Sequence, residues 1–223
     1  MIIKIDYENP RKDLLKEVAN IIKCGGLVIF PTETLYGLGG KACEESVLKR
    51  IYSIKERPPD KPLPVMTSEI SQISELVSDF PSIARLLASA YWPGPLTMIM
   101  KSKPHVSKLL TCGTNTVGIR IPDYRIVLDL LKYTGEPVAV TSANLSGEKD
   151  LLTMDEIITT FKDKVDIILD GGTLKYAIPS TVVDVTKSPP VILREGKISS
   201  EEIFKILKSE KAIHLSRIKR CNL

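Results

Sequence analysis

The sequence predicts an α/β domain built on a mixed sheet. Short apolar runs of strand length alternate along the chain with segments whose apolar residues recur at helical spacing. The 223 residues are enough for one large core, and no repeat, low-complexity segment or linker interrupts residues 1–208. We therefore expect one domain over residues 1–208 and a basic tail over residues 209–223.

The first part of the chain predicts two strands, each followed by a helix. Residues 1–7 form the first expected strand, and the helix after it begins at Asn9-Pro10 and is stopped by Cys24-Gly25-Gly26. The apolar run 27–30 is short enough to be a buried strand. A loop rich in hydroxyls and glycines, residues 31–40, then leads to an amphipathic helix that begins near Glu44.

The rest of the chain continues this alternation. Apolar periodicity predicts helices over residues 68–77, 81–90 and 124–133, and two capping sequences open helices at residues 153–161 and 199–208. Residues 141–147 are expected to form a polar turn. Further strands are expected at residues 63–66, 96–100, 116–121, 137–140, 167–169, 181–185 and 191–194.

Composition narrows the functional classes. The net charge of +4 permits an anionic partner without requiring one. The four cysteines form no C-x-x-C pair and the chain has two histidines, so we expect reduced thiols and no structural zinc. The N-terminus meets charged residues too early for a signal peptide, and no apolar run is long enough for a membrane span. We expect a soluble, cytoplasmic protein that does not bind a membrane.

The basic segment after the second helix is a candidate phosphate-binding element. Pro58 disfavours a helical conformation at Arg57, so the helix should end there, and Lys55 and Arg57 should face the same way in extended chain. Lys61 follows between prolines. Such cations suit a polyphosphate, because arginine binds its oxygens bidentately. The alternative is a solvated basic turn.

Hydroxyl and amide side chains two residues apart follow two of the apolar strands. Thr32 and Thr34 follow the strand 27–30, with glycines nearby that would allow close backbone approach to a ligand. Ser142 and Asn144 lie just beyond the strand 137–140, at the edge of the sheet where α/β proteins bind ligands. The alternative for Thr32 and Thr34 is an ordinary loop capped by threonines, which fits as well. For Ser142 and Asn144 the alternative is a turn that stabilises itself, which the tripeptide alone favours.

Arginines on two strands have an ambiguous role. Arg120 lies between isoleucines that face the other way, and Arg194 ends the last expected strand. Each points either into a wet pit or out to solvent. Ser180 precedes another strand and either caps it or touches a ligand.

The order of these segments resembles the threonylcarbamoyl-AMP synthase family, the YrdC-like proteins. The resemblance extends over residues 31–196, nearly the whole chain. The matching segments are Pro31-Thr32-Glu33-Thr34-Leu35-Tyr36-Gly37-Leu38, Lys55-Glu56-Arg57-Pro58, Trp92-Pro93-Gly94-Pro95-Leu96-Thr97, Gly118-Ile119-Arg120-Ile121-Pro122, Thr141-Ser142-Ala143-Asn144-Leu145-Ser146-Gly147, Pro179-Ser180-Thr181-Val182-Val183-Asp184 and Leu193-Arg194-Glu195-Gly196.

The resemblance implies a twisted α/β sheet with flanking helices around a concave basic pit. Its implied activity is a nucleotidyl transfer that makes threonylcarbamoyl-AMP and pyrophosphate from L-threonine, bicarbonate and ATP, with Mg²⁺ accompanying the nucleotide. The product serves threonylcarbamoyladenosine modification of tRNA, and a separate transferase machinery completes it. Direct contact with tRNA or double-stranded RNA is a further expectation.

The resemblance also implies roles for single residues. ATP and its phosphates would be bound by Lys55, Arg57, Lys61, Thr116, Ser142, Asn144 and Arg194. Threonine or its carbamate would be held by Thr34, Arg120, Thr141 and Ser180, with Arg120 on the carboxylate. Lys55 and Arg57 would be catalytic, and no side chain is expected to be a dedicated metal ligand.

Two positions and two rival functions stay open. Met66 stands where many family members have a histidine, which leaves any threonine contact of that histidine in doubt. Glu33 is a hypothetical base for the threonine amine. The rivals are a carbamoyltransferase of the kind found in hydrogenase maturation proteins, and a non-enzymatic RNA-binding factor. Aromatic residues make up only 5% of the chain, which disfavours base stacking.

Overall fold

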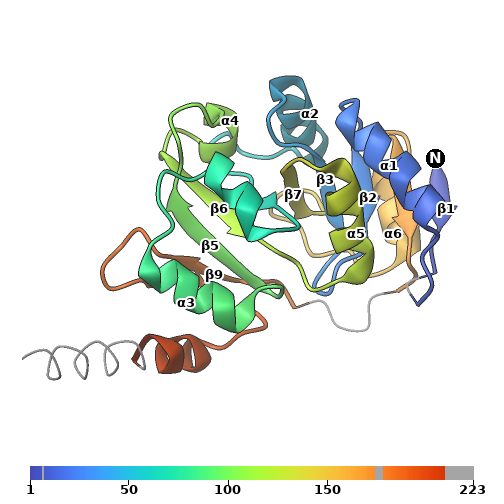
Figure 1. The fold of residues 1–223 in the computed structure, drawn as a ribbon. Coiled ribbons are helices and arrows are strands. Elements are labelled where there is room, and N and C mark those ends of the chain that lie inside the picture. Colours follow the sequence, from blue (N-terminus) through green and yellow to red (C-terminus); the bar gives the residue numbers. More distant parts are fainter. Residues whose placement is uncertain (7, 174–177, 209–223) are drawn as a thin grey trace, which may run out of the picture.

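The structure, a computed structural model, describes residues 1–6, 8–173 and 178–208. These residues form one ten-stranded mixed sheet with the strand order β1-β8-β2-β3-β7-β4-β6-β5-β9-β10 (Figure 1). The predicted α/β class and mixed sheet are therefore confirmed. The predicted basic tail, residues 209–223, lies outside the described residues.

The sheet contains both parallel and antiparallel pairs. β8 pairs in parallel with β1 and β2, β4 with β6 and β5 with β9, whereas the remaining neighbours are antiparallel. The strands are β1 (Ile2–Lys4), β2 (Val28–Phe30), β3 (Gly37–Lys41), β4 (Val65–Met66), β5 (Leu96–Lys101), β6 (Thr116–Arg120), β7 (Val138–Ser142), β8 (Ile167–Asp170), β9 (Thr181–Asp184) and β10 (Val191–Arg194).

The helices lie largely where apolar periodicity predicts them. The Thr153–Glu156 capping box is present, and residues 200–208 are helical. The named helices are α1 (Lys12–Lys23), α2 (Glu45–Lys55), the 3-10 helix η1 (Ile70–Glu75), α3 (Ser82–Tyr91), α4 (Lys108–Thr111), α5 (Arg125–Thr134) and α6 (Met154–Phe161). Among these, the short helix α4 has no counterpart in the sequence-based prediction, and η1 replaces the helix expected over residues 68–77.

The largest correction concerns the glycine-rich segment after β2. We expected a loop over residues 31–40, but residues 37–41 form β3, a strand paired with both β2 and β7. A Cβ atom on Gly37 would lie 2.8 Å from Val140 Cγ1, and one on Gly40 would lie 2.5 Å from Val47 Cγ1. These glycines allow larger neighbours to pack over the strand, so their chief role is in packing.

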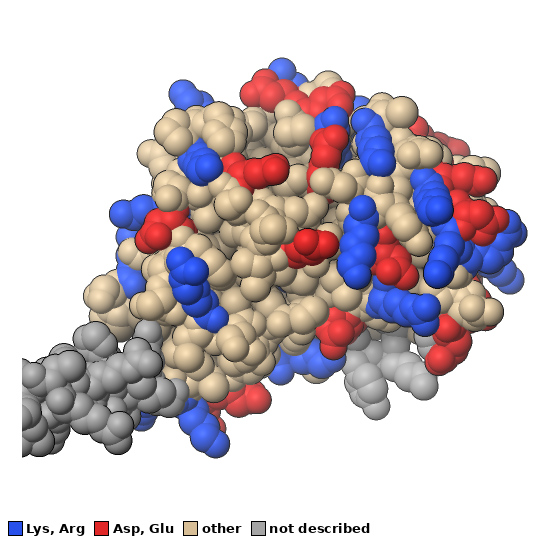
Figure 2. Space-filling model, viewed as in Figure 1, with Lys and Arg blue, Asp and Glu red and all other residues tan. Residues whose placement is uncertain are grey.

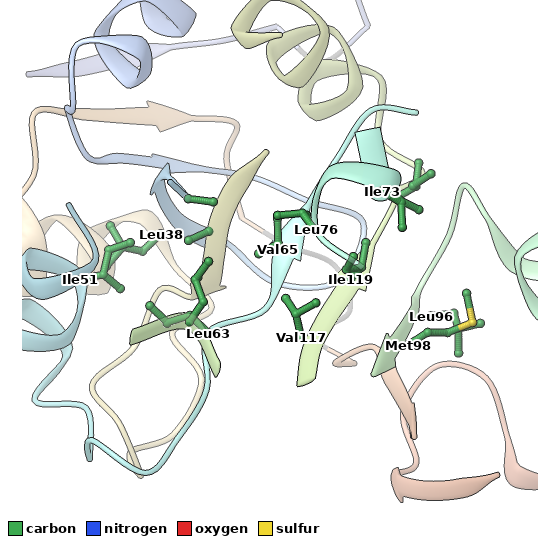
Figure 3. Close-up of a cluster of buried hydrophobic side chains, with 14 of the residues drawn as sticks. Leu38, Ile51, Leu63, Val65, Ile73, Leu76, Leu96, Met98, Val117 and Ile119 are labelled. Atoms are coloured by element: carbon green, nitrogen blue, oxygen red, sulfur yellow. The ribbon is translucent and has the colours of Figure 1, made fainter. Parts of the chain in front are cut away.

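Buried apolar side chains of the described residues form two clusters, one on each face of the sheet. In β2, Ile29 belongs to the first cluster and Val28 and Phe30 to the second. α1 and α5 lie side by side and supply the second cluster (Figure 1). Side chains of α2, α3, α4 and α6 belong to the first, which Figure 3 shows along β3, β4, β6 and β5.

Charges on the surface are mixed. On the face in Figure 2, lysines and arginines are interspersed with aspartates and glutamates among the described residues. Within the same part of the chain, every helix is too short or too polar to span a bilayer.

Candidate active site

A cavity of about 250 Å³ opens on the sheet face that α1 and α5 cover elsewhere. Met66 and Val140 belong to the apolar cluster of that face and also line the cavity. Beyond them the same face becomes polar: Arg120 follows Ile119, and Thr97 lies between Leu96 and Met98, whose side chains enter the opposite core. The cavity therefore lies where the second apolar cluster ends.

Most of the site residues predicted from the sequence meet at this cavity. Thr34, Arg57 and Arg120 line it from the first half of the chain. Thr141, Ser142, Ser180 and Arg194 line it from the second half. Segments some 160 residues apart in the chain therefore contribute to one wall, but the roles assigned to these residues stay predictions.

In the loop between β2 and β3, Thr32 stabilises the turn and Thr34 contacts Arg120 at the cavity. The Thr32 hydroxyl accepts hydrogen bonds from the backbone N–H groups of Thr34 and Leu35 and donates one to the Leu35 carbonyl at 2.6 Å. This is the loop capped by threonines that we left open as the alternative. Thr34 Oγ1 lies 3.0 Å from Thr32 Oγ1 and accepts a hydrogen bond from Arg120.

Arg120 is the most constrained cation at the site. It is 5% exposed, and its Nε donates to the Gly94 carbonyl at 3.1 Å while Nη1 donates to Thr34 Oγ1 at 3.0 Å. Nη2 lies 2.6 Å from Glu33 Oε1. An arginine has five N–H donors, more than these contacts use, so the guanidinium can also bind an anion in the cavity.

A second arginine of the cavity lining is held through Ser180. Arg194 donates from Nε and Nη2 to the Ser180 carbonyl, at 3.1 and 2.9 Å, and from Nη2 to Ser180 Oγ at 3.2 Å. Ser180 Oγ also lies 2.9 Å from Thr97 Oγ1. Burial lowers the pKa of Arg194, although nearby Asp150 opposes this change.

Lys55 does not occupy the position that we predicted. It is the last residue of α2, and Glu56 follows in a left-handed conformation, so Lys55 and Arg57 are not in extended chain. Lys55 is 1% exposed and lies outside the cavity lining, with Nζ donating to the carbonyls of Ser142 and Asn144. Burial, and then the charge of Arg57, lower its pKa to about 7.

Arg57 lines the cavity while bracing its own loop. Its Nε and Nη2 donate to the carbonyls of Lys61 and Pro62, at 2.9 and 2.6 Å. Tyr52 donates to the same Lys61 carbonyl at 2.7 Å. The Lys61 side chain is exposed and outside the lining, so the structure brings only Arg57 of the three predicted cations to the cavity wall.

Asn144 and Thr116 also lie outside the lining. Asn144 is buried, accepts from Lys55 and from Ser142 Oγ through Oδ1, and donates to the Glu148 carbonyl at 2.8 Å. It shapes the turn after β7, which is the alternative that we had left open. Thr116 Oγ1 lies 2.8 Å from Thr114 Oγ1 at the start of β6.

Several lining residues escaped the sequence-based prediction. Asp150 supplies the one carboxylate among the described lining residues, yet it follows a glycine-containing turn without any local pattern. Tyr36 donates to the Gly172 carbonyl at 2.6 Å and accepts from the Gly171 N–H at 3.1 Å, and burial raises its pKa. Tyr36 belongs to a segment that the sequence analysis singled out, but its hydrogen bonds to Gly171 and Gly172 were not predicted.

The charge balance of the cavity is modest. Arg57, Arg120 and Arg194 line it together with Asp150, and Glu33, which is not among the lining residues, pairs with Arg120. The basic character of the predicted pit therefore stays a prediction, whereas a concave site lined by arginines and hydroxyls is present.

Comparisons with known proteins point to one family. Residues 20–196 match the family model Sua5_yciO_yrdC, described as "Telomere recombination". A threonylcarbamoyl-AMP synthase of Pyrococcus abyssi is 39% identical over 193 residues, which are 86% of this chain and 57% of that protein. The Bacillus subtilis protein of the same name is 37% identical over 86% of this chain and 56% of its own length. The chain thus spans little more than half of these relatives.

Solved structures agree with this similarity. P. abyssi Sua5 complexed with L-threonine superimposes with a TM-score of 0.88 at 38% identity, over 92% of this chain and 60% of that one. Escherichia coli YciO gives a TM-score of 0.82 at 30% identity, over 92% of this chain and 98% of that chain. HypF, at 22% identity and a TM-score of 0.72, shares the fold.

Proposed function

The chain belongs to the Sua5/YciO/YrdC family, and on that premise we propose that it is an L-threonylcarbamoyladenylate synthase. It would form threonylcarbamoyl-AMP and pyrophosphate from L-threonine, bicarbonate and ATP. One observation carries the proposal: arginines and hydroxyls from distant segments meet in a cavity that suits an amino acid beside a polyphosphate. The product would pass to a separate transferase that modifies tRNA.

The amino-acid end of the cavity is assigned to Arg120. Its guanidinium is held by Thr34, Glu33 and the Gly94 carbonyl, so its direction is fixed before a substrate arrives. A carboxylate on the remaining N–H groups would gain charge-assisted hydrogen bonds. The hydroxyls of Thr34, Thr141 and Ser180 lie around the same space and would bind the other polar groups of threonine.

The phosphate end is assigned to Arg57 and Arg194, with Ser142 beside them. The threonine amine combines with bicarbonate to give a carbamate and water, and a carbamate oxygen then attacks the α-phosphate as pyrophosphate leaves. Both reactants are anions, so the fixed guanidinium groups reduce their repulsion and stabilise the leaving charge, each by about 2–4 kcal/mol if preorganised. The remaining contribution is positioning of the two reactants.

Magnesium is proposed as the companion of the nucleotide. The described residues contain no group of three or more His, Cys, Asp or Glu side chains that could hold a metal ion by themselves. Mg²⁺ commonly binds to substrate phosphates plus one or two protein oxygens, and Asp150 and Ser142 line the cavity with such oxygens. When bound, the ion would neutralise phosphate charge.

A substrate-omission assay tests the proposal. Purified protein with Mg²⁺ should convert ATP to AMP and pyrophosphate only when L-threonine and bicarbonate are both present. Turnover that needs carbamoyl phosphate would favour the carbamoyltransferase, and tight RNA binding without nucleotide turnover would favour the RNA-binding factor. Turnover with ATP alone would contradict all these assignments.

A further inference from the structure

Glu33 is a nearly buried carboxylate that forms an ion pair with Arg120 and has no role in the reaction proposed above. Its side chain is 11% exposed, and it lies outside the cavity lining, in contact with Arg120. Oε1 is engaged twice, by Arg120 Nη2 at 2.6 Å and by the backbone N–H of Asp123 at 2.8 Å. We had considered Glu33 as a base for the threonine amine, and these contacts indicate a different role.

We propose that Glu33 is a positioning residue, which fixes the direction of the Arg120 guanidinium and so sets the affinity for the amino-acid carboxylate. The identity of that carboxylate rests on the proposed function. The contacts that hold the Arg120 guanidinium do not depend on the proposed function. Glu33, Thr34 and the Gly94 carbonyl contact three different nitrogens of one guanidinium, which leaves the group no free rotation.

The contact to Asp123 explains how Glu33 is itself held. Asp123 lies between the end of β6, which carries Arg120, and the start of α5. Glu33 therefore joins the β2–β3 loop to the segment that follows β6. A carboxylate whose Oε1 already contacts a guanidinium and a backbone N–H, and which does not line the cavity, is poorly placed to accept a proton from a substrate bound there.

The unequal use of the two carboxylate oxygens gives a sharp test. Oε1 makes both contacts, whereas Oε2 is buried and has no hydrogen-bond partner among the described residues. In Glu33→Gln the amide oxygen can therefore keep both contacts while the charge and basicity are lost. Glu33→Ala loses the contacts as well. The two variants separate positioning from proton transfer.

Steady-state kinetics should show a selective effect. We expect Glu33→Ala to raise the KM for L-threonine by about tenfold or more, since about 1.4 kcal/mol corresponds to tenfold, with the KM for ATP little changed. Glu33→Gln should restore the threonine KM to within about threefold of the wild-type value. If Glu33 were instead a general base, Glu33→Gln would lower kcat by about 10²-fold or more, and that result would overturn the proposal.

Controls separate this inference from the proposed function. Glu136→Ala removes a surface carboxylate that lies 3.0 Å from Lys41 Nζ, and it should leave both KM values unchanged. An inactive wild-type protein would contradict the proposed function and not this inference. An active wild type with an unaltered threonine KM in Glu33→Ala would contradict this inference alone.

A measurement without turnover covers the case of an inactive protein. In ¹⁵N-labelled protein, the Nη protons of Arg120, assigned by comparison with Arg120→Lys, should show slow rotation and slow solvent exchange in the wild type and in Glu33→Gln. Both rates should rise in Glu33→Ala. Equal rates in wild type and Glu33→Ala would overturn the proposal, whatever reaction the protein performs.

Discussion

The ammonium of Lys55 lies against Asn144, donating to its main-chain carbonyl and, at 3.2 Å, to its side-chain oxygen. It also donates to the Ser142 carbonyl at 2.5 Å, while the Lys55 carbonyl accepts from the Ser146 N–H at 2.9 Å. The end of α2 is therefore joined in both directions to the turn after β7. Lys55 supports the turn that carries Ser142 to the cavity.

This contact predicts that Lys55→Met destabilises the fold. Lys55 is 1% exposed, so its replacement changes the interior of the protein. The variant removes the ammonium that donates to the Asn144 carbonyl, and it removes one of the donors to the Ser142 carbonyl and to Asn144 Oδ1. This loss should lower the free energy of unfolding by about 2–4 kcal/mol. Urea denaturation measures the change.

The control is Lys49→Met, on the exposed side of the same helix. It should change the free energy of unfolding by less than about 0.5 kcal/mol. Equal stability of the two variants would show that the Lys55 ammonium does not hold the turn.

The pKa of Lys55 predicts a pH dependence of stability. Burial, and next the charge of Arg57, lower it from 10.5 to about 7 in the folded protein. The folded state then binds fewer protons than the unfolded state between these values, so this group's contribution to stability rises with pH, is complete above 10.5 and is lost as the pH falls through about 7.

The slope from one such group is at most about 1.4 kcal/mol per pH unit. Urea denaturation of wild type and Lys55→Met at about pH 7 and pH 9 measures it, because the difference between the two proteins isolates Lys55 from other titrating groups. A difference that does not vary with pH would show that the ammonium keeps its proton through this range.

The glycines of β3 predict a packing effect. In Gly40→Ala the new methyl group would lie 2.5 Å from Val47 Cγ1 and 2.7 Å from Leu27 Cδ2. Overpacking of this kind should lower the free energy of unfolding by about 1–3 kcal/mol. Gly118→Ala, on β6, is the matched control, because its nearest neighbour would be Thr97 Cγ2 at an ordinary 3.4 Å. Similar denaturation midpoints for both variants would contradict the packing role.

The same strand shows why the sequence predicted some elements and missed others. β2 and β8 were predicted because their own side chains form apolar runs that enter the core, and β6 because Val117 and Ile119 enter it. β3 has few such side chains, since the residues that cover its glycines, including Phe30 and Val140, come from neighbouring strands. α4 has four residues, too few to display a helical period.

The sequence predicted which segments form the site better than it predicted which of their side chains point into the cavity. Family order brought Thr34, Arg120 and Arg194 together correctly at the cavity. Lys55 was misplaced because the prediction used Pro58 to extend the chain. The helical period gave the better signal: Lys55 follows Ile51 by one turn, and Ile51 faces the core. The prolines affect only the chain after Glu56, and the left-handed conformation of Glu56 has already changed the chain direction before them.

Arg57 provides the most direct test of the phosphate assignment. It lines the cavity and is half-buried, and its own hydrogen bonds go to the exposed loop that contains Lys61. Arg57→Ala should therefore lower kcat/KM for ATP by about 10²-fold or more, through the loss of a charge-assisted contact in the transition state. Its free energy of unfolding should fall by only about 1 kcal/mol.

Arg50→Ala is the matched control, because Arg50 lies in α2, close to Arg57 in the sequence, but is not among the residues that line the cavity. It donates to the Gly25 carbonyl at 3.0 Å and pairs with Asp166 at 3.0 Å, so its loss also removes hydrogen bonds to a carbonyl. We expect a comparable change in stability and unchanged turnover. If both variants retained wild-type kinetics while ATP was still consumed, the phosphates would have to be bound elsewhere, and Arg194 would be the next residue to replace. If Arg57→Ala alone lost activity, the guanidinium that braces the 57–62 loop would also be the one that meets the nucleotide.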